Sequence, residues 1–279
     1  MNALLFYSTL CIYFVATVTY MAYLLKPREI LGRAAHWLIA GGFVVHCAFT
    51  VARYFEAGHT PITNLHESLS FFSLTVIGVF IAFERKYHVF ILGSFVTPLA
   101  LILMLASSLY PSAIPELPPA LMSKWLFVHS TLAFISYATF SVAFGAAIMY
   151  LIQERFLKKK RLGPLYQKLP SLDILDEINY RCLTFGFPLL TVAIITGAIW
   201  AETAWGTYWS WDPKETWSLI TWFIYAALLH GRLTTGWRGK RAALFSIVGF
   251  FVLLFTFLGV NLLPSESMHS YQRLLGGKN

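Results

Sequence analysis

The sequence Trp205-Gly-Thr-Tyr-Trp-Ser-Trp-Asp-Pro-Lys-Glu-Thr-Trp217 says most about the fold and role of this chain. Six of the nine tryptophans lie between Trp200 and Trp222, and the stretch separates two apolar runs. Indole side chains are flat, rigid and apolar, with a single polar N–H each. A loop that only reversed the chain would not need four indoles within thirteen residues. The stretch therefore indicates a platform for a large planar ligand at a membrane surface.

The composition is that of an integral membrane protein. Hydrophobic residues make up 57% of the chain and charged residues 12%, against about 25% charged residues in ordinary soluble domains. The formal charge of +8 does not indicate nucleic-acid binding, because the basic residues alternate between loops in step with the apolar runs. No basic segment precedes the first apolar run and no small-residue cleavage site follows it. We therefore expect residues 1–25 to be a retained span rather than a signal peptide.

The cysteines and short motifs exclude several classes of protein. Cys11, Cys47 and Cys182 lie far apart, in or beside apolar runs, and we expect them to be small packing residues. No CxxCH sequence is present, so the chain is not itself a cytochrome with covalently attached haem. No GxSxG, HExxH or glycine-rich phosphate loop occurs either. These absences argue against the corresponding hydrolases and against an ATP-driven transporter on this chain.

Eight apolar segments are candidates for membrane-crossing helices, which need ~20 residues for a ~30 Å core. They form a single membrane domain, 1–279, with spans near 3–25, 36–53, 67–83, 89–109, 125–153, 182–201, 216–230 and 242–263, of which the seventh is short. Lipid cannot satisfy free backbone groups, and no strand-like alternation recurs along the chain. The predicted fold class is therefore an all-α polytopic membrane protein with about eight transmembrane helices.

Lysine and arginine positions predict the orientation of these helices. The loops after spans one, three, five and seven hold sixteen basic residues, and the opposite side holds five. The side richer in lysine and arginine is expected to be cytoplasmic. Both termini and the Trp-rich loop, residues 202–217, are then expected on the outer side.

Two loops have distinct predicted structures. The cytoplasmic loop 154–181 begins with a basic run that suits lipid headgroups. Between Ser171 and Tyr180, apolar residues recur every three positions, at Leu172, Leu175 and Ile178, which predicts an amphipathic helix on the inner membrane surface. The outer segment Tyr110–Pro119 contains four prolines and is predicted to be an ordered or extended loop.

Two of the eight histidines, His129 and His269, are predicted at the outer boundary, level with the Trp-rich loop. His129 lies about one turn inside span five, and His269 follows the end of span eight by six residues. Two neutral imidazoles facing each other across an aromatic surface are what a six-coordinate haem iron needs. The alternative for the tryptophans is an interfacial aromatic belt. A belt would scatter them over many helix ends instead of gathering six around one loop.

His230 is predicted inside the membrane. It follows Thr216 by fourteen residues, which places it ~21 Å deeper at ~1.5 Å per residue. Histidines at such depth are costly and are functional sites by default. The alternative is a ring that reaches the inner surface beside Arg232. The other histidines give weaker signals: His46 is intramembrane without an evident partner, His36 and His88 flank span starts, and His59 lies in an outer loop.

Charged residues of the Trp-rich loop match the start of a helix. Asp212 suits the N-cap, Pro213 the first helical position and Glu215 the third. This structural role does not exclude a role in ligand binding. The propionates of a haem would need cationic partners, and Arg53, Lys124 and Lys214 are the basic residues near the outer face before the C-terminal tail. The sequence does not choose among the three.

The Trp-rich stretch resembles the WWD signature of haem-handling proteins of cytochrome c biogenesis, and within them most closely the CcsA (ResC) family of the system II pathway. Further motifs of that family occur in the same order. They are Pro61-Ile-Thr-Asn-Leu-His-Glu-Ser68, Ala120-Leu-x-Ser-Lys-Trp-Leu-x-x-His129, Leu172-Asp through Tyr180-Arg, Leu229-His230-x-Arg232, and Asn261-Leu-Leu-Pro followed by Met268-His-Ser-Tyr271.

The resemblance implies a function and a set of site residues. Proteins of this family bind haem b, deliver it to the outer face and, with a Ccs1/ResB-type membrane protein, attach it to the CxxCH thiols of apocytochrome c. His129 and His269 would be axial ligands of the outer haem, and His230 would contribute to an intramembrane site completed by the partner. The cradle of the outer haem would comprise Trp205, Tyr208, Trp209, Trp211, Asp212 and Trp217. His66 receives no ligand role, because the family commonly has an aromatic residue there.

The resemblance also implies a location and leaves alternatives. The chain would be a multi-pass subunit of a cytochrome c haem lyase in the cytoplasmic (inner) membrane, or in the thylakoid membrane of a plastid. Its partners would be haem, apocytochrome c, the Ccs1/ResB-type protein and the lipid bilayer, without nucleic acid. Alternatives are a haem exporter or carrier without lyase activity, and a HemX-like regulatory membrane protein. A dihaem quinol-oxidising electron carrier is disfavoured, because only His46 and His230 are plausible intramembrane histidines.

Overall fold

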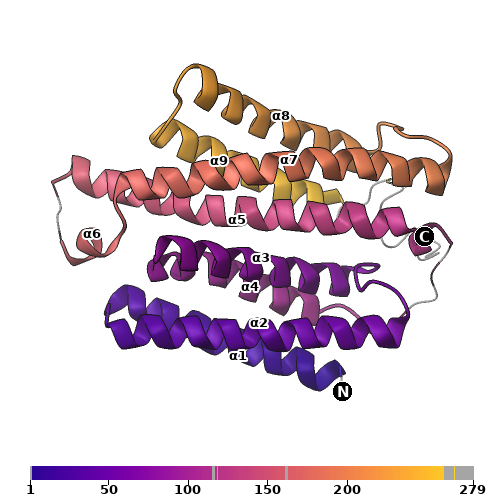
Figure 1. Ribbon diagram of the computed structural model, residues 1–279, viewed down its shortest axis with the longest axis horizontal. Helices are drawn as coiled ribbons and strands as arrows, with labels where there is room; N and C mark the ends of the chain where they lie inside the picture. Colours follow the sequence, from indigo (N-terminus) through magenta and orange to yellow (C-terminus); the bar gives the residue numbers. More distant parts are fainter. Residues whose placement is uncertain (1, 115–116, 118, 161–162, 261–266, 268–279) are drawn as a thin grey trace.

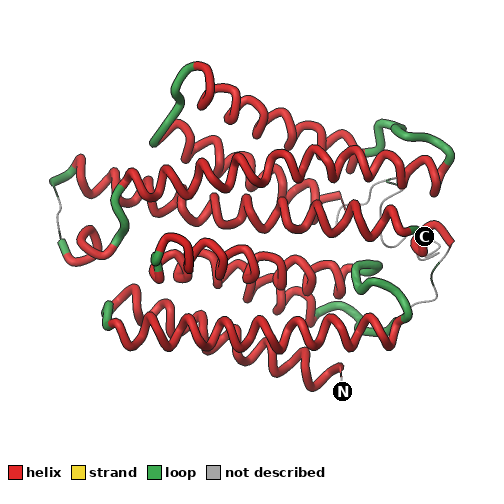
Figure 2. Tube along the Cα trace, in the orientation of Figure 1, coloured by secondary structure: helices red, strands yellow, loops and turns green. Residues whose placement is uncertain are grey.

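The computed structural model describes residues 2–114, 117, 119–160, 163–260 and 267, and within these residues every regular element is a helix (Figures 1 and 2). The elements are α1 (Asn2–Leu25), α2 (Glu29–Ala57), α3 (Leu65–Tyr87), the short η1 (Phe90–Leu92), α4 (Gly93–Ser108), η2 (Pro119–Met122), α5 (Lys124–Lys158), α6 (Pro164–Lys168), α7 (Leu172–Trp205), α8 (Pro213–Thr234), α9 (Lys240–Leu254) and the π-helical η3 (Phe255–Gly259). The predicted all-α membrane fold is confirmed.

Seven of the described helices are long and apolar enough to cross a membrane. The eighth predicted span, 216–230, lies in α8, whose 22 residues extend ~33 Å at ~1.5 Å per residue. Its polar and charged side chains, which include Lys214, Glu215, His230 and Arg232, make α8 less apolar than the seven. Figure 1 shows α8 beside α7, running back along it. The eighth span stays a prediction, which the length and position of α8 support.

The helices form two halves, with α1–α4 in one and α5, α7, α8 and α9 in the other (Figure 1). Successive loops alternate between the two ends of the bundle. The start of α1 and the loop between α7 and α8 lie at one end, and the connections α1–α2, α3–α4, α5–α7 and α8–α9 lie at the opposite end. The predicted alternation of the loops is therefore confirmed. Which end faces the cytoplasm stays a prediction.

The segment Ser171–Tyr180 does not form a helix of its own. It starts α7, a continuous helix of 34 residues that includes the predicted span 182–201. Leu175 and Ile178 are fully buried in the protein core instead of facing lipid. The prediction of a separate amphipathic helix on the membrane surface is therefore wrong, because the apolar stripe packs against neighbouring helices. Residues 110–114 are non-helical, as predicted for the proline-rich loop.

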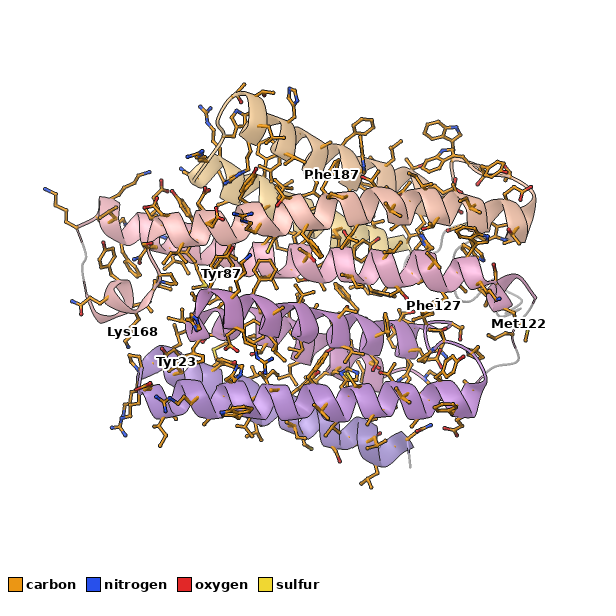
Figure 3. The ribbon with its side chains drawn as sticks, viewed as in Figure 1. Tyr23, Tyr87, Met122, Phe127, Lys168 and Phe187 are labelled. Atoms are coloured by element: carbon orange, nitrogen blue, oxygen red, sulfur yellow. The ribbon has the colours of Figure 1, made fainter. Side chains whose placement is uncertain are left out.

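Aromatic and polar contacts join the two halves. Phe72 of α3 packs against Phe134 of α5 and Phe257 of η3, with ring centroids 5.8 and 5.5 Å apart. At the end of the bundle where Lys168 of α6 lies (labelled in Figure 3), its ammonium group donates to the backbone carbonyl of Leu25 at 2.8 Å. This bond satisfies one of the carbonyls that the end of α1 leaves without a helical partner.

The first half also buries polar side chains between its helices. The ring of His46 is fully buried and bonds Tyr13 at 3.1 Å and Ser70 at 2.9 Å. The sequence had given no partner for this histidine. The buried Arg53 guanidinium pairs with Glu67 at 2.9 Å. Buried polar groups of this kind are tolerated in a membrane because each one has a partner.

Candidate functional site

The Trp-rich loop is fixed at both ends by helix caps. Gly206 ends α7 in the left-handed conformation, with φ of 76°, and its N–H bonds the Glu202 carbonyl. Asp212 caps α8, Pro213 occupies the first helical turn, and the side chain of Glu215 bonds back to the Asp212 backbone. The predicted cap is therefore confirmed. These caps place the loop residues between them against the ends of α5 and α7.

Glu215 organises the loop from inside. Its Oε2 accepts hydrogen bonds from Ser210 N at 2.8 Å, Ser210 Oγ at 3.2 Å and Asp212 N at 3.2 Å. Its Oε1 is buried and has no hydrogen-bond partner among the residues that the structure describes. A buried acceptor without a donor costs about 1–3 kcal/mol. A buried acceptor of this kind calls for an explanation, such as a bound water or a functional role.

His129 is held in one orientation by α7. Its Nδ1 lies 2.7 Å from the backbone carbonyl of Ala193. A carbonyl only accepts, so Nδ1 carries the proton, and in the neutral ring the Nε2 atom has the lone pair. The ring stacks on Trp200, with an interplanar angle of 13°. A methyl group added to Gly197 would lie 2.6 Å from Nδ1, so only glycine leaves room for the ring.

A cleft with a cavity of about 60 Å³ opens beside His129. That volume is below the ~300–1,000 Å³ of most small-molecule and cofactor sites. It is bounded by α5, α7, the Trp-rich loop, the start of α8 and η3. The lining residues are His129, Ala133, Tyr137, Leu190, Ala193, Ile194, Gly197, Ala198, Tyr208, Trp209, Lys214, Glu215, Ser218 and Thr256. The cleft is therefore lined by the His129 imidazole, by flat aromatic side chains, and by the charged side chains of Lys214 and Glu215.

The predicted cradle residues divide between this cleft and its surroundings. Tyr208 and Trp209 line the cleft together with His129. Trp205 packs edge-on against Trp200, which in turn stacks on His129. Trp211 is exposed and meets Trp209 edge-on, with centroids 5.7 Å apart. Trp217 packs on Phe255 instead, away from the cleft lining.

The other two predicted iron ligands lie elsewhere. His269 is outside the described residues. Ser267, two positions earlier, is buried, and its Oγ donates to Asp212 Oδ1 at 2.9 Å. His230 lies in the last turns of α8, at the end of this helix opposite the Trp-rich loop, and its side chain is exposed. The structure therefore does not bring His230 to the cleft.

The turn after His230 is held by a buried ion pair. Arg232 bonds both carboxylate oxygens of Asp176, at 2.7 and 3.0 Å, and its side chain is only 5% exposed. Asp176 also accepts from Gly239 N at 2.9 Å. One residue of α7 thus fixes the end of α8 and the start of α9. The alternative role for His230, a ring that reaches the surface beside Arg232, is compatible with its exposed position near the end of α8 and stays open.

Lys214 is the only one of the three candidate cations that lines the His129 cleft. Arg53 is paired with Glu67 in the first half, and Lys124 borders a separate groove beside α2. Burial lowers the pKa of Lys214 from its ordinary 10.5 to about 8, although nearby Asp212 acts in the opposite direction. Of the three candidate propionate partners, Lys214 is thus the one that borders the cleft, and the propionate role itself stays a prediction.

The sequence reasoning missed the part that α7 plays in this site. Ala193, Gly197 and Ala201 form a row of small residues at every fourth position. Such rows let membrane helices approach closely, and here the row admits the His129 ring against the α7 backbone. That spacing was the available signal. Glu215 was identified only as a capping residue.

Comparisons with known proteins agree with these features. Residues 62–269 match the family described as cytochrome C assembly protein. The cytochrome c biogenesis protein CcsA of Guillardia theta is 41% identical over 241 residues, which cover 78% of this chain and 79% of the relative. This chain belongs to the CcsA family. The CcsA protein of Synechocystis sp. is 35% identical, in a match that covers 93% of this chain and 95% of the relative.

Membership of the CcsA family assigns the chain to cytochrome c biogenesis and makes it a multi-pass membrane protein. The Trp-rich stretch is accordingly the WWD region of a system II protein. The solved structure of a cytochrome c heme lyase, CcmF, has the same fold, with a TM-score of 0.69 at 19% identity. The match covers 95% of this chain and 47% of that larger one.

Proposed function

We propose that this CcsA-family chain binds haem b through His129 and His269 at the outer face and, with a Ccs1/ResB-type membrane protein, attaches it to the CxxCH thiols of apocytochrome c. The observation that carries the proposal is the orientation of His129. Its Nδ1–H donates to the Ala193 carbonyl, so Nε2 is the ring atom that can bind a metal beside an aromatic cleft. A backbone carbonyl behind the ring is the usual support for a metal-binding histidine.

The exposed face of α8 supports a second haem site shared with the partner. Ile220, Phe223 and His230 follow one another at helical spacing and are all exposed. An imidazole facing hydrocarbon is costly, so a partner helix that covers this face would remove the cost and supply the other iron ligand. Haem would enter near His230 and pass to the outer cleft.

The two outer histidines would position the haem and protect its oxidation state. Thioether formation needs free thiols and ferrous iron, and a bis-histidine site holds the iron while the vinyl groups remain available. The chain would then be a subunit of a cytochrome c haem lyase. Its membrane would be the cytoplasmic membrane, or the thylakoid membrane in a plastid.

The test is the absorption spectrum of the chain purified with its partner. Replacing both His129 and His269 by alanine should abolish the low-spin signal of the outer haem and cytochrome c maturation. His59→Ala, at the same end of the bundle but outside the cleft, is the control and should mature cytochromes normally. If the double variant matures cytochromes normally without added imidazole, the ligand assignment is wrong.

Two other outcomes would replace the proposed function. The first is measured with this chain and its partner as the only biogenesis proteins present. If haem then binds but no covalent cytochrome c forms, the chain is a haem carrier without lyase activity. Absence of bound haem, with maturation unaffected by deletion, would indicate a HemX-like regulatory protein.

A further inference from the structure

A second cavity lies in the first half, at the end of the bundle that holds the Trp-rich loop, between the start of α1 and the ends of α2 and α4 (Figure 1). Its volume is about 130 Å³. A water-sized position takes ~10–15 Å³, so the cavity has room for roughly nine to thirteen such positions. Four aromatic side chains line it, namely Phe6, Tyr7, Phe49 and Tyr110. Such walls favour a flat ring as the occupant.

His66, near the start of α3, brings a free ring nitrogen to this cavity. The residue is 5% exposed, and its Nδ1 lies 2.8 Å from the backbone carbonyl of Ser107. A carbonyl only accepts, so Nδ1 carries the proton and Nε2 of the neutral ring has the lone pair. Nε2 makes no hydrogen bond within the described part of the chain and, unlike the fully buried atoms without a partner, it keeps accessible surface. The ring lines the cavity, which therefore contains an open acceptor.

The side chains around the cavity do not satisfy this acceptor. The hydroxyl of Ser108 donates to the Leu105 carbonyl at 2.6 Å. The remaining side chains of the lining that could donate are those of Asn2, Tyr7, Arg53, Tyr110 and Ser112, and none of them bonds the His66 ring. Nε2 is therefore available to a donor on a molecule inside the cavity.

Arg53 of α2 supplies a complementary donor. Its Nε and Nη2 atoms bond Glu67 Oε1 at 3.0 and 2.9 Å, and Nη2 also reaches the Ala113 carbonyl at 3.4 Å. Nη1 has no hydrogen bond to a described residue, and it too keeps accessible surface. Because Glu67 neutralises the guanidinium, the polar wall of the cavity offers a donor and an acceptor without net charge.

This combination selects a neutral ligand. A metal ion would have one nitrogen ligand and would be repelled by the guanidinium beside it. An anion would gain little from Arg53, because the Glu67 carboxylate already lies against that charge. A ring with hydroxyl groups suits the site better, since a hydroxyl donates as well as accepts.

We propose that this cavity binds the headgroup of a membrane quinol. One hydroxyl of the ring donates to His66 Nε2, and a ring oxygen accepts from Arg53 Nη1. The oxidised quinone has no hydroxyl to donate, so the site prefers the reduced form. The apolar tail would leave the cavity beside Leu4 and Tyr7 of α1, which are 72% and 57% exposed. The site is separate from the His129 cleft, and the proposal does not depend on haem binding.

Two variants of His66 separate the ligand bond from the bond inside the protein. In His66→Asn the amide nitrogen can still donate to Ser107, but nothing takes the place of Nε2. In His66→Gln the longer side chain can bring its amide oxygen to the position of Nε2, while the bond to Ser107 is lost. A purely structural role would make His66→Gln the more damaging change, whereas the proposed role makes His66→Asn the more damaging one for binding.

The experiment measures the dissociation constant of labelled decylhydroquinone by anaerobic equilibrium dialysis. The full chain is held in lipid nanodiscs, and uptake by protein-free nanodiscs is subtracted. The dimethyl ether of the same probe keeps the ring, the tail and both oxygens but has no O–H. Decanoate, which has a similar tail and a carboxylate, tests for an anion site.

His66→Asn should raise the dissociation constant of decylhydroquinone by about tenfold, as expected for the loss of one hydrogen bond to a buried group. His66→Gln should raise it by less than about threefold. The dimethyl ether should bind the unchanged protein about tenfold more weakly than the quinol does, and it should bind His66→Asn and the unchanged protein equally.

Equal affinity of the unchanged protein for decylhydroquinone and its dimethyl ether would overturn the proposal, and this result does not depend on whether a variant folds. Equal affinity of His66→Asn and the unchanged protein for the quinol would also overturn it. If decanoate displaces the quinol at equal concentration, the cavity is an anion site instead.

Discussion

Gly197 offers the sharpest perturbation of the proposed outer site. A Cβ atom there would lie 2.6 Å from His129 Nδ1 and 2.7 Å from Cε1, whereas ordinary contacts begin at 3.4 Å. In Gly197→Ala the ring or the helix must therefore move by 0.8 Å, the difference between 3.4 and 2.6 Å. The bond from Nδ1 to Ala193 O, now 2.7 Å, would lengthen or break.

Gly197→Ala should have a small effect on the stability of the fold and a large effect on haem binding. Overpacking costs about 1–3 kcal/mol, while alanine gains about 1 kcal/mol over glycine in a helix. The free energy of unfolding should therefore fall by no more than about 2 kcal/mol. Displacing a catalytic or ligand group by ~1 Å costs on the order of 100-fold in rate. The low-spin haem per protein should fall at least about tenfold, and cytochrome c yield with it.

The assay compares reduced and oxidised absorption spectra of the complex with covalent cytochrome c formed in the same cells. Gly186→Ala is the matched control. It makes the same change in the same helix, and its Cβ would meet Phe140 at 3.0 Å, far from His129 in sequence and contacts. If Gly197→Ala contains as much low-spin haem and yields as much cytochrome c as Gly186→Ala, then α7 does not set the position of an iron ligand.

Two further predictions concern stability. Asp176→Asn should lower the free energy of unfolding, measured in detergent, by about 3 kcal/mol, because it leaves the buried Arg232 guanidinium without its counter-charge. The control is Glu177→Gln, which should change the free energy of unfolding by less than about 1 kcal/mol because its pair with Arg181 is exposed. Lys214 binds fewer protons in the folded than in the unfolded protein between pH about 8 and 10.5, so stability should contain a term that rises with pH across this range. Lys214→Met should remove that rise, and an unchanged pH profile of unfolding would contradict the assignment.

The parts of the fold that depend on nearby residues were predictable. The Asp212 cap involves positions two and three residues apart, so the sequence contains all of it. The spans follow from length and hydropathy, since lipid leaves few alternatives to a helix. The helix at Ser171–Tyr180 was predicted as helix but placed wrongly, because its pattern does not say whether lipid or protein covers the apolar stripe.

The cleft itself depends on residues far apart along the chain. His129 and Ala193 are 64 positions apart, and the small-residue row of α7 indicates a close helix contact without saying which helix makes it. The same holds for which of Arg53, Lys124 and Lys214 borders the cleft, because this depends on how distant helices pack. The residue types thus predicted an aromatic site with a metal-binding histidine, and only the tertiary structure shows which side chains line the same cleft.

The bond between Lys168 and Leu25 also bears on the order in which the protein is made. The two residues are 143 positions apart. At ~5–20 residues per second, synthesis separates them by roughly seven to thirty seconds. During that time α1 is complete, but its final carbonyl lacks this donor. The first half of the bundle can therefore form this hydrogen bond only after α5 and α6 have been synthesised. Its folding is completed only when part of the second half, which contains the proposed haem cleft, is present.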